Sequence, residues 1–183
     1  MSILFINACV RKNSRTLILA NSIMKDMVGG ITEVDLCRLG LMPLDGESLE
    51  KRERLLREGR YDDPMLEYAK QFAAADEIVI AAPFWDLSFP AMLKIYLEQI
   101  TVPGITFRYE KGIPEGLCRA KSLTYVTTSG GPILDDFGYT YVKALARNFF
   151  GISKTRAYRA MNLDGDMISA EELLHRAKIS VVE

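Results

Sequence analysis

Uninterrupted apolar runs along the chain predict strands that are buried on both faces of a sheet. Residues 78–82 form the clearest run, and residues 3–6 form a shorter one. Residues 31–36 alternate apolar with polar positions, which is typical of an edge strand half open to water. Residues 122–127 and 152–160 complete a set of five predicted strands.

Segments with helical spacing separate these strands. Helices are predicted at about residues 14–28, 62–73, 90–100, 135–149 and 169–179. The charged segment 47–59 is interpreted as a solvated helix or a mobile flap. Residues 102–120 carry several glycines and are too long for a compact crossover, so they predict a hairpin or a lid.

This alternation indicates one α/β domain over residues 1–183. The predicted architecture is a doubly wound, five-stranded parallel sheet of flavodoxin-like type, with strand order 2-1-3-4-5 and helices on both faces. In such sheets ligands bind outside the carboxyl ends of the strands, where the strand order reverses. The loops after the first, third and fourth strands therefore carry the candidate chemistry.

Each of these three loops offers a different kind of contact. In the first, Ser14 is a candidate N-cap, and the free N–H groups of the helix with Ser14 and Thr16 form a cradle for a phosphate. Arg11, Lys12 and Arg15 are candidate cationic partners for it. The second loop supplies Pro83, Phe84, Trp85, Asp86 and Leu87, and the third supplies Thr128, Ser129, Gly130 and Gly131. Together they fit a flavin mononucleotide, FMN.

Composition narrows the function classes. The formal net charge of −1 gives no support for a nucleic-acid or membrane surface built on bulk charge. The chain has no apolar run near the ~20 residues of a membrane helix and opens directly into a strand, so a cytoplasmic location is expected. Cys9, Cys37 and Cys118 are odd in number and far apart, and no metal site is predicted.

Several motifs resemble the flavodoxin-fold NAD(P)H-dependent quinone reductases and azoreductases. They span most of the chain in the family's order: Asn13-Ser-Arg-Thr16, Ala82-Pro-Phe-Trp-Asp-Leu87 with Pro90-x-x-Leu93-Lys94, Gly104-Ile-Thr-Phe-Arg-Tyr109 with Pro114-x-Gly-Leu117, and Thr127-Thr-Ser-Gly-Gly131. The segment Thr106-Phe-Arg-Tyr109 is the most specific of them.

The resemblance implies an FMN-dependent NAD(P)H oxidoreductase that passes two electrons by a ping-pong mechanism to quinones or azo compounds. NADH or NADPH would be a transient co-substrate, and the protein would be a homodimer. Ser14 and Thr16, with Arg15 beside them, would hold the phosphate. Residues 83–87 would line the ribityl chain and ring, and residues 128–131 the pyrimidine side. Trp85, Gly130 and Gly131 would support chemistry at flavin N5, with no side chain acting as a catalyst itself.

Two points leave alternatives open. Asp86 stands where azoreductases usually have Asn, and a carboxylate there would disfavour a reduced anionic ring. A flavodoxin-like FMN electron carrier without small-molecule turnover is the main alternative, and a flavin-free binding protein is a third. A hydrolase is disfavoured because the single histidine, His175, is expected on the surface, and Cys9 is interpreted as a small buried residue.

Overall fold

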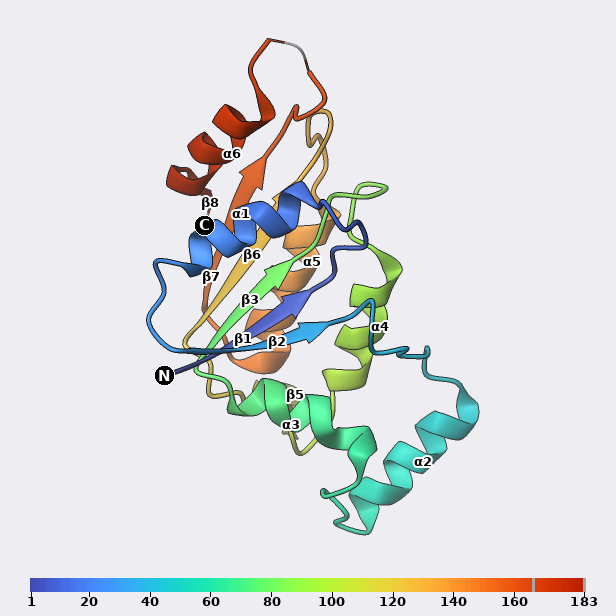
Figure 1. The fold of residues 1–183 in the computed structure, drawn as a ribbon. Helices are drawn as coiled ribbons and strands as arrows, with labels where there is room; N and C mark the ends of the chain where they lie inside the picture. The colour runs from blue at the N-terminus through green and yellow to red at the C-terminus, as the bar shows by residue number, and fades with distance from the viewer. Residues whose placement is uncertain (166, 183) are drawn as a thin grey trace.

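The computed structural model describes residues 1–165 and 167–182. Strands and helices alternate along the chain as predicted (Figure 1). The elements are β1 (Ser2–Asn7), α1 (Arg15–Met24), β2 (Gly30–Asp35), α2 (Gly46–Arg57), η1 (Pro64–Leu66), α3 (Glu67–Ala74), β3 (Glu77–Ala81), α4 (Ala91–Ile100), β4 (Phe107–Glu110), β5 (Ile113–Gly116), β6 (Ser122–Thr128), α5 (Phe137–Leu145), η2 (Ala146–Phe150), β7 (Lys154–Ala160), α6 (Ala170–Ile179) and β8 (Val181–Val182).

The central sheet has the order β2-β1-β3-β6-β7-β8. Its first five strands are parallel, and because β6 and β7 are the fourth and fifth predicted strands, the predicted order 2-1-3-4-5 is confirmed. The sixth strand was not predicted. Strand β8 has two residues and runs antiparallel to β7, which is too short for a sequence pattern to reveal.

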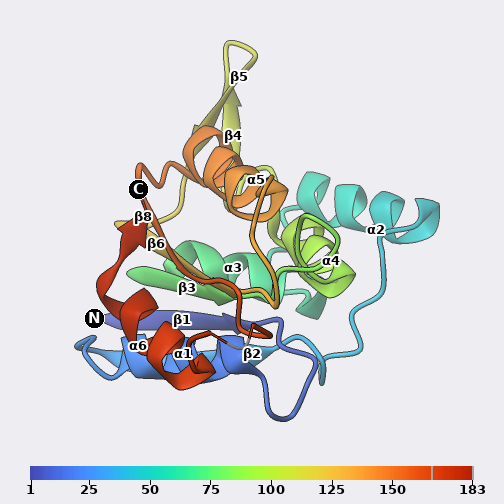
Figure 2. The same ribbon diagram turned by 90° about the horizontal axis from the view of Figure 1, so that it is seen from above.

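Two apolar layers hold the helices against this sheet, one on each face (Figure 2). Ile78 and Ile80 point to the face covered by α3, α4 and α5, whereas Val79 and Ala81 point to the face covered by α1 and α6. Alternate side chains of a strand face opposite sides, so a strand covered twice needs apolar residues at every position. This is the physical reason for the uninterrupted run at β3.

The charged segment at residues 47–59 is a helix, α2, which lies at the margin of the molecule (Figure 2). Its N-cap is Asp45, whose side chain accepts a hydrogen bond from the Ser48 N–H at 2.8 Å. Leu55 is its only buried residue within the described chain, so α2 packs by a narrow apolar contact and leaves most of its charges in water. The half-buried Arg52 is an exception, because its Nη1 donates to the Glu98 carbonyl at 3.0 Å.

The insertion at residues 102–120 contains the β4–β5 hairpin, which projects beyond α5 (Figure 2). Its base contacts the segment before β7: a side chain at Gly116 would place Cβ 2.0 Å from the Gly151 nitrogen. Phe107 also packs edge-on against Phe149, with ring centroids 5.1 Å apart. The hairpin is therefore fixed at the amino end of β7, away from the carboxyl edge of the sheet.

Among the residues described, none of the helices combines the length and the apolar character needed to cross a membrane.

Candidate functional site

The first loop joins β1 to α1 at the carboxyl edge of the sheet. Ser14 is the N-cap of α1, and its Oγ accepts a hydrogen bond from the Leu17 N–H at 3.3 Å, which leaves the Ser14 hydroxyl proton free to donate to a ligand. The buried Thr16 Oγ1 lies 2.6 Å from Thr128 Oγ1, so the first loop is tied directly to the third. The unpaired N–H groups of the first helical turn make this end of the cavity suited to an anion.

The second loop continues the pairing of β3 with β6 and then turns sharply. The Phe84 N–H donates to the Thr128 carbonyl at 3.0 Å, and Trp85 and Ser88 exchange backbone hydrogen bonds of 3.1 and 2.8 Å. The two residues between them, Asp86 and Leu87, have φ values of 51° and 65°. This is a two-residue hairpin turn with both central residues left-handed, a conformation that favours Gly or Asn.

The turn is held in place by α5, because the Phe137 N–H donates to the Leu87 carbonyl at 3.0 Å. Leu87 is 46% exposed, so its side chain gains little from packing to offset the backbone strain. Backbone strain of this kind is concentrated at functional sites.

The third loop is fixed by the end of β7 and by the segment that follows it. The Ser129 N–H donates to the Ala160 carbonyl at 2.9 Å, and the Asp164 N–H donates to the Gly130 carbonyl at 3.1 Å. Gly130 has no left-handed φ, so its lack of a side chain is explained by close approach. A Cβ there would lie 2.0 Å from Asp164 Oδ2.

Behind this loop, a buried ion pair supports the start of α5. Arg159 Nη2 lies 2.7 Å from Asp136 Oδ2, and the Asp136 side chain is only 8% exposed. Asp136 also caps α5 by accepting from the Tyr139 N–H at 2.8 Å. The Arg159 guanidinium lies over the Tyr139 ring, 5.3 Å from its centroid. These contacts fix where the third loop enters the helix.

The three loops enclose a cavity of about 170 Å³. Its wall contains nine of the twelve predicted binding residues, namely Ser14, Arg15, Thr16, Pro83, Phe84, Trp85, Thr128, Ser129 and Gly130. The structure therefore brings Ser14, Trp85 and Gly130 to a single rim. Asp86, Leu87 and Gly131 are not among the lining residues, and the turn geometry accounts for the first two.

The wall also contains residues outside the predicted set, namely Val10, Arg11, Asn13 and Asp164. Arg11 and Lys12 were both predicted from the sequence as cationic partners for an anion. Arg11 lines the cavity, and Lys12 does not. Val10 and Asp164 were missed. Asp164 lies just beyond the carboxyl end of β7, at the same sheet edge as the three loops, and that position was the available signal.

The hairpin at residues 102–120 contributes nothing to this wall. His175 is exposed on α6 and is also absent from the wall, so no histidine lies beside Ser14 to act as a base. The expectation of a surface histidine is confirmed.

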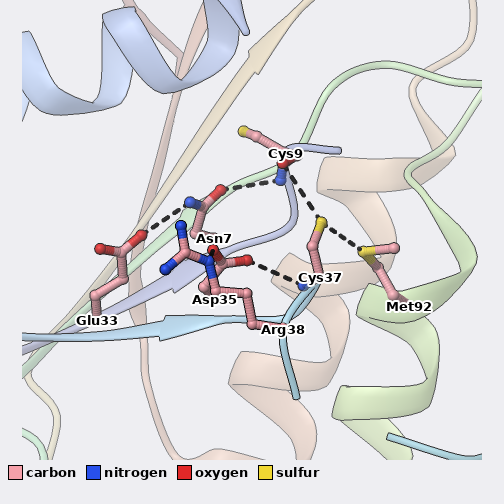
Figure 3. Close-up of polar contacts among 7 residues, drawn as sticks. All are labelled: Asn7, Cys9, Glu33, Asp35, Cys37, Arg38 and Met92. Atoms are coloured by element: carbon pink, nitrogen blue, oxygen red, sulfur yellow. Dashed lines mark hydrogen bonds and ion pairs between the residues drawn. The ribbon is translucent and has the colours of Figure 1, made fainter. Parts of the chain in front are cut away.

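Cys9 belongs to the first loop, between β1 and α1, and is confirmed as a small buried residue, 7% exposed. Its N–H donates to Asn7 Oδ1 at 2.9 Å, and Cys37 Sγ lies 3.5 Å from the Cys9 carbonyl and 3.6 Å from Met92 Sδ (Figure 3). Burial raises the pKa of the Cys9 thiol to about 11. The thiol is therefore protonated at neutral pH and is a poor nucleophile.

The cavity has one polar, cationic end and one aromatic side. Arg11, Arg15 and the hydroxyl of Ser14 lie at the polar end, and Phe84 and the 38% exposed Trp85 form the aromatic side. This donor set fits a phosphate monoester that carries a flat apolar ring. Thiolate, histidine-base and serine-hydrolase chemistry have no matching residues in the wall.

Comparison with known proteins gives the same fold. The whole chain, residues 1–183, matches the flavodoxin-like fold family. It is 38% identical over 140 residues to FMN-dependent NADH:quinone oxidoreductase 2 of Clostridium acetobutylicum, covering 73% of this chain and 69% of that protein. It is 32% identical over 180 residues to the FMN-dependent NADH:quinone oxidoreductase of Clostridium perfringens, covering 93% and 90%. The crystal structure of an azoreductase from Bacillus anthracis superposes with a TM-score of 0.83 at 22% identity, covering 98% and 95%.

Strain in the second loop predicts that a glycine substitution at Leu87 stabilises the protein. A left-handed conformation costs an L-residue about 1–2 kcal/mol, whereas glycine loses about 0.5–1 kcal/mol more backbone entropy on folding. Leu87→Gly should therefore raise the free energy of unfolding by about 0.5–1 kcal/mol in urea denaturation. Leu134→Gly is the control, because Leu134 is 82% exposed and outside the left-handed region, and it should be destabilising. Equal effects of the two changes would show that the turn is unstrained.

The raised pKa of Cys9 predicts slow alkylation. In a Cys37→Ser, Cys118→Ala variant, iodoacetamide at pH 8 should modify folded Cys9 roughly a hundred-fold more slowly than the urea-unfolded chain, because burial raises the pKa of the thiol from 9.0 to about 11. The folded rate should keep rising toward pH 11, whereas a plateau near pH 9 would contradict the burial effect. Because the folded-state pKa is raised, Cys9 contributes stability below pH 9 that is lost as the pH approaches 11.

Proposed function

Because the chain belongs to the flavodoxin-like fold family, and its cavity joins an anion-binding end to an aromatic side, we propose that it is an FMN-dependent NADH:quinone oxidoreductase. The observation that supports this most is the convergence of Ser14, Trp85 and Gly130, which are distant in sequence, on one cavity. The relatives named as FMN-dependent NADH:quinone oxidoreductases support the same activity.

The binding roles follow the chemistry of the wall. Ser14, Arg15 and Thr16, with the first turn of α1, would hold the FMN phosphate through charge-assisted hydrogen bonds. Pro83, Phe84 and Trp85 would cover the ring, and Thr128, Ser129 and Gly130 would lie along its pyrimidine side. Asp86, Leu87 and Gly131 would act through the backbone of their turns, since they do not line the cavity.

The chemistry that FMN supplies when bound is two-electron transfer from NADH or NADPH to a quinone or azo compound. The chain's own contribution is to position and to stabilise charge. The Gly130 backbone N–H would donate a hydrogen bond to the electron-rich side of the ring, as a preorganised dipole does, and Gly131 would support the conformation of that loop. A ping-pong order follows if nucleotide and oxidant use the same open face beside Trp85.

The chain would act as one domain, in the cytoplasm, as a homodimer. The β4–β5 hairpin supports the homodimer, because it exposes Tyr109 (60%) and Ile113 (70%) and lies at the opposite end of the sheet from its own cavity. If the hairpin acts as a lid, it would therefore cover the cavity of a second copy of the chain. Sedimentation velocity of the FMN-loaded protein tests this, and a monomer at micromolar concentration would contradict it.

Rapid anaerobic mixing with NADH or NADPH tests the activity itself. An oxidoreductase should lose its visible flavin absorbance directly, and a quinone or azo compound should then restore it. The electron carrier, the alternative function, would be reduced only through a partner protein. A purified protein that binds no FMN would contradict both functions.

Ser14 has a capping role and a proposed ligand role, and these can be separated. Ser14→Ala should cost about 1 kcal/mol of stability and should also weaken FMN binding roughly ten-fold, from loss of a hydrogen bond to a charged group. Ser169→Ala is the control, because Ser169 caps α6 by accepting from the Glu172 N–H at 3.2 Å and does not line the cavity. It should lose similar stability with unchanged FMN affinity by fluorescence titration. Equal FMN affinities of the two variants would remove Ser14 from the site.

A further inference from the structure

Arg15, the first residue of α1, already has hydrogen-bond partners within the protein. Its Nη1 donates to the Leu163 carbonyl at 2.6 Å, and its Nη2 lies 2.5 Å from Asp164 Oδ1. Arg15 and Asp164 both line the cavity. A carboxylate therefore stands at the anion-binding end of the cavity and uses the group that an incoming phosphate would bind.

The position of Asp164 is set by its backbone. The Asp164 N–H donates to the Gly130 carbonyl at 3.1 Å, and the Leu163 N–H donates to the Ser129 carbonyl at 3.2 Å. Asp164 Oδ2 lies so close to Gly130 that a Cβ there would be 2.0 Å away. The carboxylate is thus held between the first and third loops, with one oxygen toward Arg15 and the other against Gly130.

The ion pair itself is weakly held. The side chains of Arg15 and Asp164 are 32% and 68% exposed, and ion pairs in water contribute little because solvent screens them. The Asp164 side chain can therefore leave Arg15 while the backbone hydrogen bonds of its segment remain.

We propose that Asp164 is a specificity-determining residue that competes with the phosphate of the flavin for Arg15, and so limits the preference for FMN over riboflavin. This rests on the proposed function. A guanidinium binds carboxylates and phosphates through the same N–H donors, and Asp164 and the Leu163 carbonyl already use Nη2 and Nη1 of Arg15, so a phosphate that binds at these nitrogens competes with Asp164. Riboflavin has the same ring without the phosphate, so Asp164 has no such effect on its affinity.

Asp164→Asn tests the proposal because it keeps the shape of the side chain and removes its charge. FMN should bind up to about five-fold more tightly to this variant, from the upper end of the strength of an exposed ion pair, whereas the dissociation constant for riboflavin should not change. Both constants are measured by flavin fluorescence titration of the flavin-free protein, so the readout does not depend on turnover.

Asp26→Asn is the matched control. Asp26 is 70% exposed and lies 2.8 Å from Lys178, so this change also breaks an exposed ion pair and removes one negative charge. Asp26 is not in the cavity wall, and FMN affinity should stay unchanged. An equal gain in the control would show that only the net charge of the protein matters, which would overturn the proposal.

An Arg15→Gln background distinguishes competition from simple repulsion between Asp164 and the phosphate. If Asp164 acts by occupying Arg15, Asp164→Asn gives no gain in FMN affinity once Arg15 is absent. A gain that persists in this background, or an equal gain for riboflavin, overturns the proposal. Wild-type protein that binds no flavin removes the proposed function as well, whereas tight FMN binding that is unchanged by Asp164→Asn removes only this inference.

Discussion

The burial of the central strands on both faces is the constraint on which the rest of the molecule depends. Strands β1, β3 and β6 have helices above and below, so the middle of β1 and β3 is apolar and the hydroxyls of Thr124 and Thr127 in β6 are buried. Of these three strands, the cavity wall includes Thr128, which is the last residue of β6. Ligand-binding groups are therefore confined to the loops at the strand ends. Because the five long strands are parallel, those loops meet at one edge, where hydroxyl, guanidinium and aromatic groups from distant parts of the chain form a single cavity.

Features that follow from local pattern were predictable from the sequence. The run at residues 78–82 revealed a doubly covered strand, Ser14 was placed correctly as a helix cap, and the order of the five parallel strands followed from the alternation of strands and helices. Helix α1 ends at Met24 and not near Val28, because apolar spacing continues past the last helical hydrogen bonds. Strand β8 carries too few residues to give a periodic signal.

The site shows where local reasoning stops. Gly130 was interpreted as a way for the backbone to approach a ligand, but the structure shows that the space beside its Cα is taken by Asp164, which is 34 positions later in the chain. The family resemblance placed Asp86 and Leu87 along the ring. In the structure both lie in a left-handed turn, and neither an aspartate nor a leucine predicts that conformation from the sequence. Contacts between loops depend on tertiary placement, which no pattern within one loop encodes.

The antiparallel strand β8 has a consequence for how the protein assembles. Val181 and Val182 pair with Tyr158 and Ala157 and so use the outward-facing hydrogen-bonding groups of β7 at those positions. An open strand margin is a template on which another polypeptide can polymerise in register. Because Val181 and Val182 cover part of that margin with a strand of two residues, the edge that they leave is short, and a short edge strand hinders growth of a sheet into fibrils.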